Sequence, residues 1–120
     1  MAETFLYLTT IGRKSGQPRE IEIWYVSHDG RHYLVAEGRE NAHWVQNIIQ
    51  NPAVQFYIGA GWGSGTPAPA TARTIDPQAE PELARAVSDL MDAKYNWSDG
   101  LIVEIAPEAA ATAPPDPTPG

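Results

Sequence analysis

The residues best suited to chemistry in this sequence lie in one short basic segment, "TTIGRKSGQPREIEIWYV" at positions 9–26. Four polar donors fall inside seven residues of it: Arg13, Lys14, Ser15 and Arg19. Guanidinium groups, an ammonium, a hydroxyl and free backbone N–H groups suit a phosphate or a carboxylate. Gly12 and Gly16 let the backbone turn and approach a ligand closely. The spacing predicts either an anion-binding loop or an ordinary charged loop between two strands.

The overall composition contrasts with this segment. The 120 residues carry eight Lys and Arg against fifteen Asp and Glu, for a formal net charge of −7. Nucleic-acid binding needs a broad basic surface, so we expect no nucleic-acid partner and only a local role for positive charge. The absence of cysteine excludes disulfides and thiolate metal sites.

Targeting signals are not evident in the sequence. No apolar run approaches the length that crosses a bilayer. The opening "MAETFLYL" lacks the basic start, long apolar stretch and small-residue cleavage site of a signal peptide. We therefore expect a cytoplasmic protein without a membrane span.

The elements that must position the basic segment are mostly strands. Aromatic and β-branched residues, alternation and turn signals predict strands over 4–11, 19–27, 31–37, 53–58, 69–75 and 101–106. Asp29-Gly30 predicts a tight hairpin. Helical spacing predicts one helix over 41–52, capped by Asn41, and a second that opens at Asp76-Pro77 and ends near Tyr95. This order favours a mainly β fold, an antiparallel barrel with two helices, over residues 1–106, followed by a disordered Pro/Ala-rich tail over 107–120.

Two other patterns predict no separate site. "GAGWGSG" at 59–65 is followed by prolines and a strand instead of the helix that a dinucleotide-binding motif requires, so we interpret it as a hairpin loop that is able to fold over a ligand. His28 and His32 flank the Asp29-Gly30 turn and are expected to face each other, while His43 lies on the first helix. Without a third ligand beside the pair, we expect no metal site.

Three blocks of the sequence carry a resemblance to a known family. "LTTIGRKSGQPREIEIWYV", "DGRHYLVAE" and "HWVQNIIQNPAVQF" are similar to successive blocks of the deazaflavin-dependent nitroreductases, within the flavin/deazaflavin oxidoreductase superfamily of split β-barrels. The resemblance runs from about Thr4 to Ala106. It implies an FMN-binding split-barrel-like fold and the reduced deazaflavin coenzyme F-420 as cofactor, a long polyanion with a phosphate, an oligoglutamate tail and a flat tricyclic head.

The resemblance also implies a set of cofactor-binding residues. The basic loop would hold the phosphate and tail through Arg13, Lys14, Ser15, Gly16 and Arg19. The segment after the third strand, Ala36, Glu37 and Gly38, would lie against the deazaflavin, and Trp44 and Asn47 would border the pocket. Glu37 departs from the small Ser of many relatives, and it would either repel an anionic cofactor or hydrogen-bond the ring edge. Arg39 beside it is expected to offset the charge.

The function that the resemblance implies is hydride transfer from coenzyme F-420 to an electron-poor small molecule such as a quinone or a nitroaromatic compound. The catalytic proton donor is left open among Tyr25, Tyr95 and solvent. Two alternative functions remain: an FMN-dependent split-barrel oxidoreductase, and a non-catalytic deazaflavin- or flavin-binding protein. A homodimer is expected by analogy, with outward apolar residues such as Trp24 at its interface.

Overall fold

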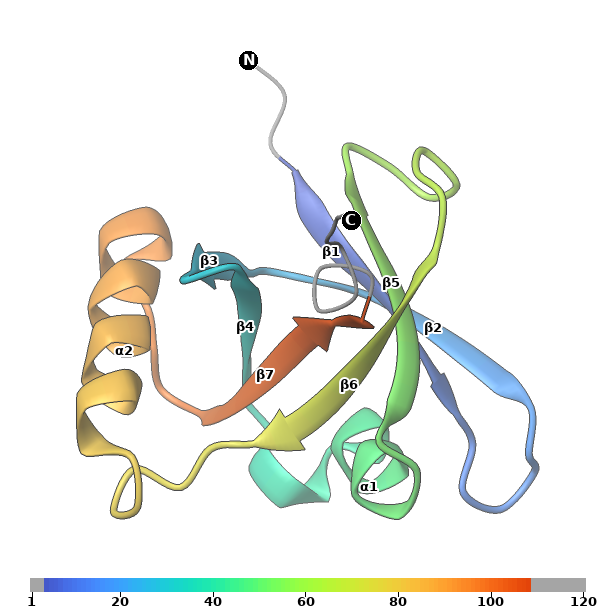
Figure 1. Ribbon diagram of the computed structural model, residues 1–120, viewed down its shortest axis with the longest axis horizontal. Helices are drawn as coiled ribbons and strands as arrows, with labels where there is room; N and C mark the ends of the chain where they lie inside the picture. The colour runs from blue at the N-terminus through green and yellow to red at the C-terminus, as the bar shows by residue number, and fades with distance from the viewer. Residues whose placement is uncertain (1–3, 109–120) are drawn as a thin grey trace, which may run out of the picture.

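Hairpins build a single antiparallel sheet whose strands are joined in an order that curls it into a barrel. The computed structural model describes residues 4–108 (Figure 1). Within this range the sheet has seven strands in the order β2-β1-β5-β6-β7-β4-β3. Their bounds are Phe5–Ile11 for β1, Pro18–Ile23 for β2, Val26–His28 for β3, Arg31–Ala36 for β4, Ala53–Gly59 for β5, Ala68–Thr74 for β6 and Leu101–Pro107 for β7. The predicted mainly β, split-barrel-like fold is confirmed.

The predicted single strand over 19–27 is wrong, because the chain changes sheet partners within it. β2 pairs with β1, whereas β3 pairs with β4 at the other end of the strand order. Trp24 and Tyr25 form the connection, so one short crossing links the two edges of the sheet. On its other side β2 has no hydrogen-bonded strand within residues 4–108, and the barrel is split there.

The β3–β4 hairpin forms at Asp29 and Gly30 as predicted. Both residues have positive φ, 57° and 81°, which is the geometry that such two-residue turns require. The register pairs His28 with Arg31 and His32 with Ser27. His28 and His32 are therefore not opposite each other, contrary to expectation, and Ser27 Oγ lies 2.7 Å from Nδ1 of His32. In the described range no three His, Asp or Glu side chains gather into a possible metal site.

Two apolar clusters lie on opposite faces of the sheet. The barrel interior holds the first, which includes Leu6, Leu8, Leu34, Val45, Phe56 and Ile105. The second lies under α2 (Pro81–Tyr95) and includes Tyr33, Val35, Ile75, Val87, Met91 and Ile102. Because β4 and β7 contribute to both clusters, four consecutive residues of each are buried. Figure 1 shows α1 at one end of the barrel and α2 along its side.

Both helices begin later than the sequence predicts. α1 spans His43–Gln50, and its cap is Ala42, which makes no side-chain capping hydrogen bond. Asn41 belongs instead to a preceding 3-10 turn, Arg39–Asn41. Before α2, the backbone oxygen of Asp76 accepts the N–H groups of Ala79 and Glu80 in a separate turn, and Pro81 then starts the helix. No helix in the described range is long and apolar enough to span a membrane.

A buried carboxylate ties the strands under α2 together. Glu104 on β7 is 3% exposed and accepts hydrogen bonds from Tyr33 Oη at 2.9 Å and from Arg73 Nε at 2.9 Å. Arg73 also binds Glu80 just before α2, at 2.7 Å and 3.1 Å. Of the predicted tail over 107–120, Pro107 ends β7, and 109–120 lie outside the described residues.

Candidate functional site

Two adjoining cavities, of about 660 Å³ and about 650 Å³, lie along the open side of β2 and share Trp44 as a lining residue. We call the two together the groove. From β2 and the crossing after it, Arg19 to Ile21 line the second cavity and Glu22 to Trp24 line the first. At a rise of about 3.3 Å per residue, these six residues extend over about 17 Å. The groove is therefore long enough for a molecule much longer than a single ring system.

The second cavity holds the basic loop, and we call it the cationic end. Its lining includes Arg13, Lys14, Ser15 and Arg19, with Glu20 as the one carboxylate among its lining residues. The loop is tightly closed, because Gly12 N donates to Gln17 O and Gly16 N donates to Gly12 O, each at 2.8 Å. Gly16 has a φ of +72°, and a Cβ on Gly12 would lie 2.7 Å from Ser15 Oγ. Both predicted glycine positions are thus required by the turn.

Arg13 is docked on α1 through Asn47. Asn47 Oδ1 accepts the backbone N–H of Arg13 at 3.1 Å and its Nη1 at 3.0 Å. The Asn47 amide in turn donates to Thr10 Oγ1 at 3.2 Å, and both side chains are almost fully buried. Arg13 Nη2 also lies 3.3 Å from Nδ1 of His43. Asn47 therefore fixes the basic loop against the helix.

The first turn of α1 adds to the positive character of this end. His43 and Trp44 both line the cationic end, and the helix lacks a side-chain cap. Uncapped N–H groups at a helix N-terminus attract negative charge. Together with three cationic side chains, this arrangement is suited to a ligand that carries several negative charges.

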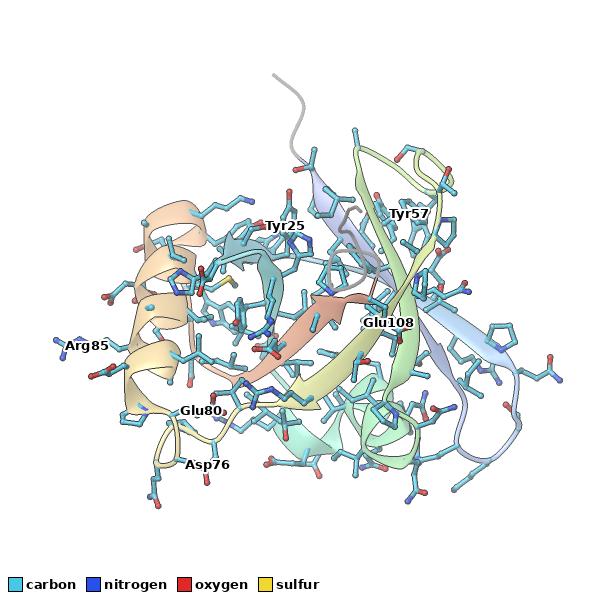
Figure 2. All side chains as sticks on the ribbon, viewed as in Figure 1. Tyr25, Tyr57, Asp76, Glu80, Arg85 and Glu108 are labelled. Atoms are coloured by element: carbon cyan, nitrogen blue, oxygen red, sulfur yellow. The ribbon has the colours of Figure 1, made fainter. Side chains whose placement is uncertain are left out.

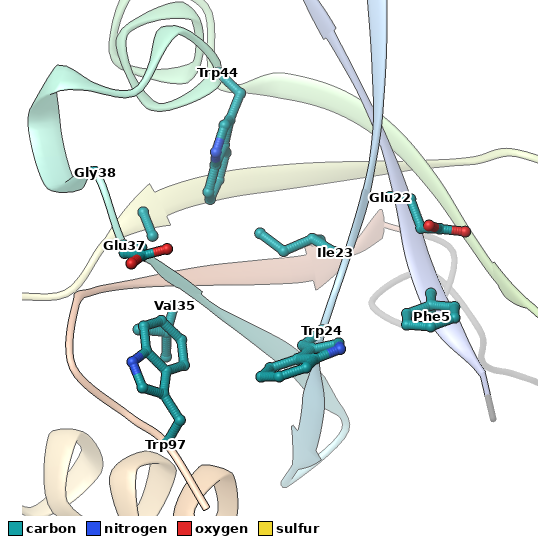
Figure 3. Close-up of a pocket in the computed structure, with 10 residues that line it drawn as sticks. Phe5, Glu22, Ile23, Trp24, Val35, Glu37, Gly38, Trp44 and Trp97 are labelled. Carbon is teal, nitrogen blue, oxygen red and sulfur yellow. The ribbon is translucent and has the colours of Figure 1, made fainter. Parts of the chain in front are cut away.

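The first cavity is bordered by indoles, and we call it the aromatic end. Trp24, Trp44 and Trp97 surround it (Figure 3). Trp24 stacks on Tyr95 with ring centroids 4.4 Å apart and contacts Trp97 edge-on at 6.3 Å. The backbone at Ala36 and Gly38 forms part of the wall. Such a site is suited to a flat aromatic molecule, which can stack on indole faces.

Trp97 was not identified from the sequence. It follows Asn96, whose φ of 56° ends α2 in the left-handed region and turns the chain toward β7. The Asn after a helix signals such a turn, but only the tertiary fold determines which side chain then enters the groove. Trp24, predicted at a dimer interface, lines the aromatic end and is 40% exposed.

Two carboxylates line the aromatic end, and they differ in their surroundings. Glu22 accepts a hydrogen bond from Tyr7 Oη at 2.6 Å, and its carboxylate points away from the cavity (Figure 3). Burial, followed by this hydrogen bond, raises the pKa of Tyr7 to about 12. Glu37 points into the cavity (Figure 3). Arg39, which was expected to offset the charge of Glu37, pairs with Asp99 at 2.7 Å, and no ion pair joins it to Glu37 among the described residues.

Tyr25 and Tyr95 are not among the residues that line the groove. Tyr95 Oη donates to the backbone oxygen of Tyr25 at 3.0 Å, and Tyr25 Oη lies 3.0 Å from Thr4 Oγ1. Lys94 Nζ sits over the Tyr25 ring at 4.1 Å. Each hydroxyl thus has a partner outside the groove. A catalytic role for either tyrosine stays a prediction that the groove lining does not support.

The glycine-rich segment at 59–65 folds against the outside of the barrel. Its Trp62 meets Tyr7 edge-on at 5.0 Å, and Tyr57 Oη accepts the N–H of Gly63 at 2.6 Å. No residue of this segment is among those lining the groove in the described part of the chain. In Figure 1 this loop and the basic loop lie at opposite ends of β1.

The predicted cofactor-binding residues come together along the groove. Those lining the cationic end are Arg13, Lys14, Ser15, Arg19, Trp44 and Asn47. Ala36, Glu37, Gly38 and again Trp44 line the aromatic end. Gly16 shapes the basic loop without lining the cavity. Their contact with a cofactor remains a prediction.

Comparison with known proteins gives both a family and a fold. A sequence model described as F420H(2)-dependent quinone reductase matches residues 1–99. Among solved structures, the heme storage protein HutZ of Vibrio cholerae superposes with a TM-score of 0.67 at 17% identity, over 86% of this chain and 80% of that one. A FAD-binding protein of Mesorhizobium loti gives 0.64 at 16% identity, over 88% and 82%. A structure named F420 Reductase gives 0.57 at 17% identity, over 86% and 85%.

Proposed function

We propose a reaction and a binding mode from one premise: the chain belongs to the F420H(2)-dependent quinone reductase family and is a coenzyme F-420-dependent oxidoreductase. The proposed reaction is the two-electron reduction of a quinone, a nitroaromatic compound or a similar electron-poor molecule. The proposed place is the groove along β2.

The cationic end fits the anionic part of the cofactor. A phosphate and an oligoglutamate tail need several positive groups along an extended path, and this end offers Arg13, Lys14 and Arg19 against one carboxylate, Glu20. Arginine binds phosphates and carboxylates through paired N–H donors, and lysine acts as a point charge. Asn47 keeps Arg13 in place before any ligand arrives, which lowers the entropy cost of binding.

The aromatic end fits the flat head. Stacking on Trp24, Trp44 or Trp97 would hold a tricyclic ring system and keep water from one of its faces. The backbone at Ala36 and Gly38 offers close approach, because neither residue has a side chain larger than a methyl group. The head would therefore lie at the end of the groove away from the basic loop.

The chemistry that reduced coenzyme F-420 supplies when bound is donation of a hydride. This chain's residues bind and orient the reactants, and no side chain has to act as a nucleophile. Reduction of a quinone to a hydroquinone takes two electrons and two protons, of which the hydride brings both electrons and one proton. Since the aromatic end is open to solvent, water can provide the second proton.

The observation that carries this proposal is the sorting of residues along one groove, with the cations at one end and the indoles at the other. The test titrates the purified protein with reduced coenzyme F-420 and, separately, with FMN, while quenching of tryptophan fluorescence is followed. Menadione or a nitroaromatic compound is then added, and oxidation of the bound cofactor is recorded against a protein-free control.

Binding of coenzyme F-420 with faster oxidation than in the control would support the proposal. Tight binding without turnover on a broad acceptor panel would instead favour a cofactor-binding protein without activity on these acceptors. Preference for FMN would overturn the proposed binding mode. A homodimer stays a prediction, which size-exclusion chromatography with light scattering tests.

A further inference from the structure

Charge is distributed unevenly along the groove. The three cationic side chains of the groove lining all belong to the cationic end. The residues that line the aromatic end include Glu22 and Glu37 but no Lys, Arg or His. A molecule entering at the aromatic end therefore meets a wall with carboxylates and no cation in direct contact.

Of these two carboxylates, Glu37 is the one whose charge reaches the cavity. Glu22 is held by Tyr7, whose ring is fully buried and stacks on Tyr57 at 4.8 Å. Glu37 follows the last residue of β4 and is exposed, and its side chain makes no hydrogen bond or ion pair with another residue of the described range. In Figure 3 its carboxylate projects into the space between Trp44 and Trp97.

The indoles strengthen the effect of this charge. An indole presents the negative face of its ring quadrupole, which attracts cations. Apolar walls also lower the local dielectric and screen a nearby charge less than open water does. Both effects favour a positively charged molecule beside Glu37 and disfavour a negatively charged one.

We propose that Glu37 sets the charge preference of the electron acceptor, so that cationic acceptors are used best, uncharged acceptors next and anionic acceptors worst. This inference rests on the proposed function, because an acceptor that takes a hydride from the flat head has to lie beside it at the aromatic end. The two ends of the groove would then treat anions differently. The cationic end attracts the anionic tail of the cofactor, and Glu37 repels an anionic acceptor from the aromatic end.

The first experiment compares three naphthoquinones as acceptors for reduced coenzyme F-420: uncharged 1,4-naphthoquinone, its 2-sulfonate, and a derivative bearing a trimethylammonium group. Their intrinsic reactivities differ, so the measured quantity is the ratio of kcat/KM between two acceptors, compared between proteins. In Glu37→Gln, the sulfonate-to-uncharged ratio should rise about tenfold and the ammonium-to-uncharged ratio should fall about threefold.

Glu40→Gln is the matched control. Glu40 is an exposed carboxylate three residues further along, and it is not among the residues lining the groove. Both ratios should match the wild type in this variant. Equal ratios in the wild type and Glu37→Gln would overturn the inference, as would an equal change in Glu40→Gln.

The second experiment needs no turnover. Three of the four tryptophans line the aromatic end, and the fourth is Trp62. In a Trp62→Phe background, quenching of tryptophan fluorescence in the cofactor-free protein reports on the groove alone. We expect the sulfonate to bind about tenfold more weakly than uncharged naphthoquinone and this gap to shrink when Glu37→Gln is added.

These readouts separate the two claims. If no acceptor is reduced but the charge preference in binding depends on Glu37, the proposed reaction fails and the role of Glu37 stands. If uncharged quinone is reduced and the preference does not depend on Glu37, the reaction stands and the inference is overturned.

Discussion

Asn47 accepts two hydrogen bonds from Arg13 through one side-chain oxygen, at 3.1 Å from the backbone nitrogen and 3.0 Å from Nη1. The two residues are 34 positions apart in the chain. This contact joins the basic loop to α1, and the amide nitrogen of Asn47 donates a hydrogen bond to Thr10 Oγ1. The buried side chain of Asn47 therefore fixes the position of the basic loop.

Asn47→Ala should loosen the basic loop. It leaves buried Thr10 without this partner, which we expect to cost about 1–3 kcal/mol of unfolding free energy. Affinity for coenzyme F-420 should fall about tenfold, because Arg13 is no longer held in place. Urea unfolding and fluorescence titration measure the two effects. Gln50→Ala, an exposed site on the same helix, should change neither, and unchanged affinity in Asn47→Ala would contradict a positioning role.

Arg13→Ala combined with Arg19→Ala should weaken cofactor binding by more than about tenfold at low salt. The wild-type affinity should fall as ionic strength rises, and the double variant should lose most of that dependence. Isothermal titration at several salt concentrations measures both. Arg85→Ala serves as the control, since Arg85 projects from α2 away from the sheet (Figure 2). A double variant with wild-type affinity would remove the loop from the site.

Stability should decline at alkaline pH through two tyrosines. Burial raises the pKa of Tyr7 and of Tyr33 to about 12 from 10.0, with Glu22 and Glu104 as their respective hydrogen-bond partners. A raised pKa means that the neutral phenol is favoured in the folded state. This contribution is complete below pH 10 and is lost as the pH rises toward 12.

The double variant Tyr7→Phe with Tyr33→Phe tests this pH dependence. Its unfolding free energy, measured in urea between pH 9 and 11, is expected to fall with pH less steeply than that of the wild type. Each single variant should show an intermediate slope. Identical slopes in all four proteins would show that these phenols do not contribute.

Arg73→Met should destabilise the fold far more than Glu80→Gln. Removing the guanidinium leaves the buried carboxylate of Glu104 with Tyr33 and a longer contact to Arg31 at 3.8 Å, which should cost about 3 kcal/mol. The partly exposed Arg73–Glu80 pair is screened by solvent and should contribute much less. Thermal and urea unfolding compare the two. Equal effects would mean that Glu104 finds water or another partner.

The sequence predicted the local features of this molecule well and the long-range ones less well. The Asp29-Gly30 hairpin and the closed turn at Gly12 and Gly16 follow from backbone preferences of a few residues. The break at Trp24-Tyr25 does not, because alternation continues through it while the pairing partner changes. That break depends on the closure of the sheet, which only the whole chain decides.

For the site, too, the sequence predicted local features better than contacts between distant residues. The basic loop stands out by charge against an acidic background, and the resemblance added Trp44 and Asn47. Trp97 enters the groove after a turn of the chain, and no spacing rule connects it to Trp24 or Trp44. Arg39, two residues after Glu37, was expected to offset its charge, yet its side chain pairs with Asp99, 60 residues later. Pairs of this kind depend on which strand ends meet in space.

Among the described residues β2 is paired on one side only, and this has a consequence for the protein without its cofactor. An unpaired strand edge offers free N–H and C=O groups to any other chain, and such edges promote aggregation. A molecule seated in the groove would border β2 and cover part of this edge. Cofactor-free protein should then be the form that self-associates, and supply of the cofactor during expression should decide how much of the protein stays in solution.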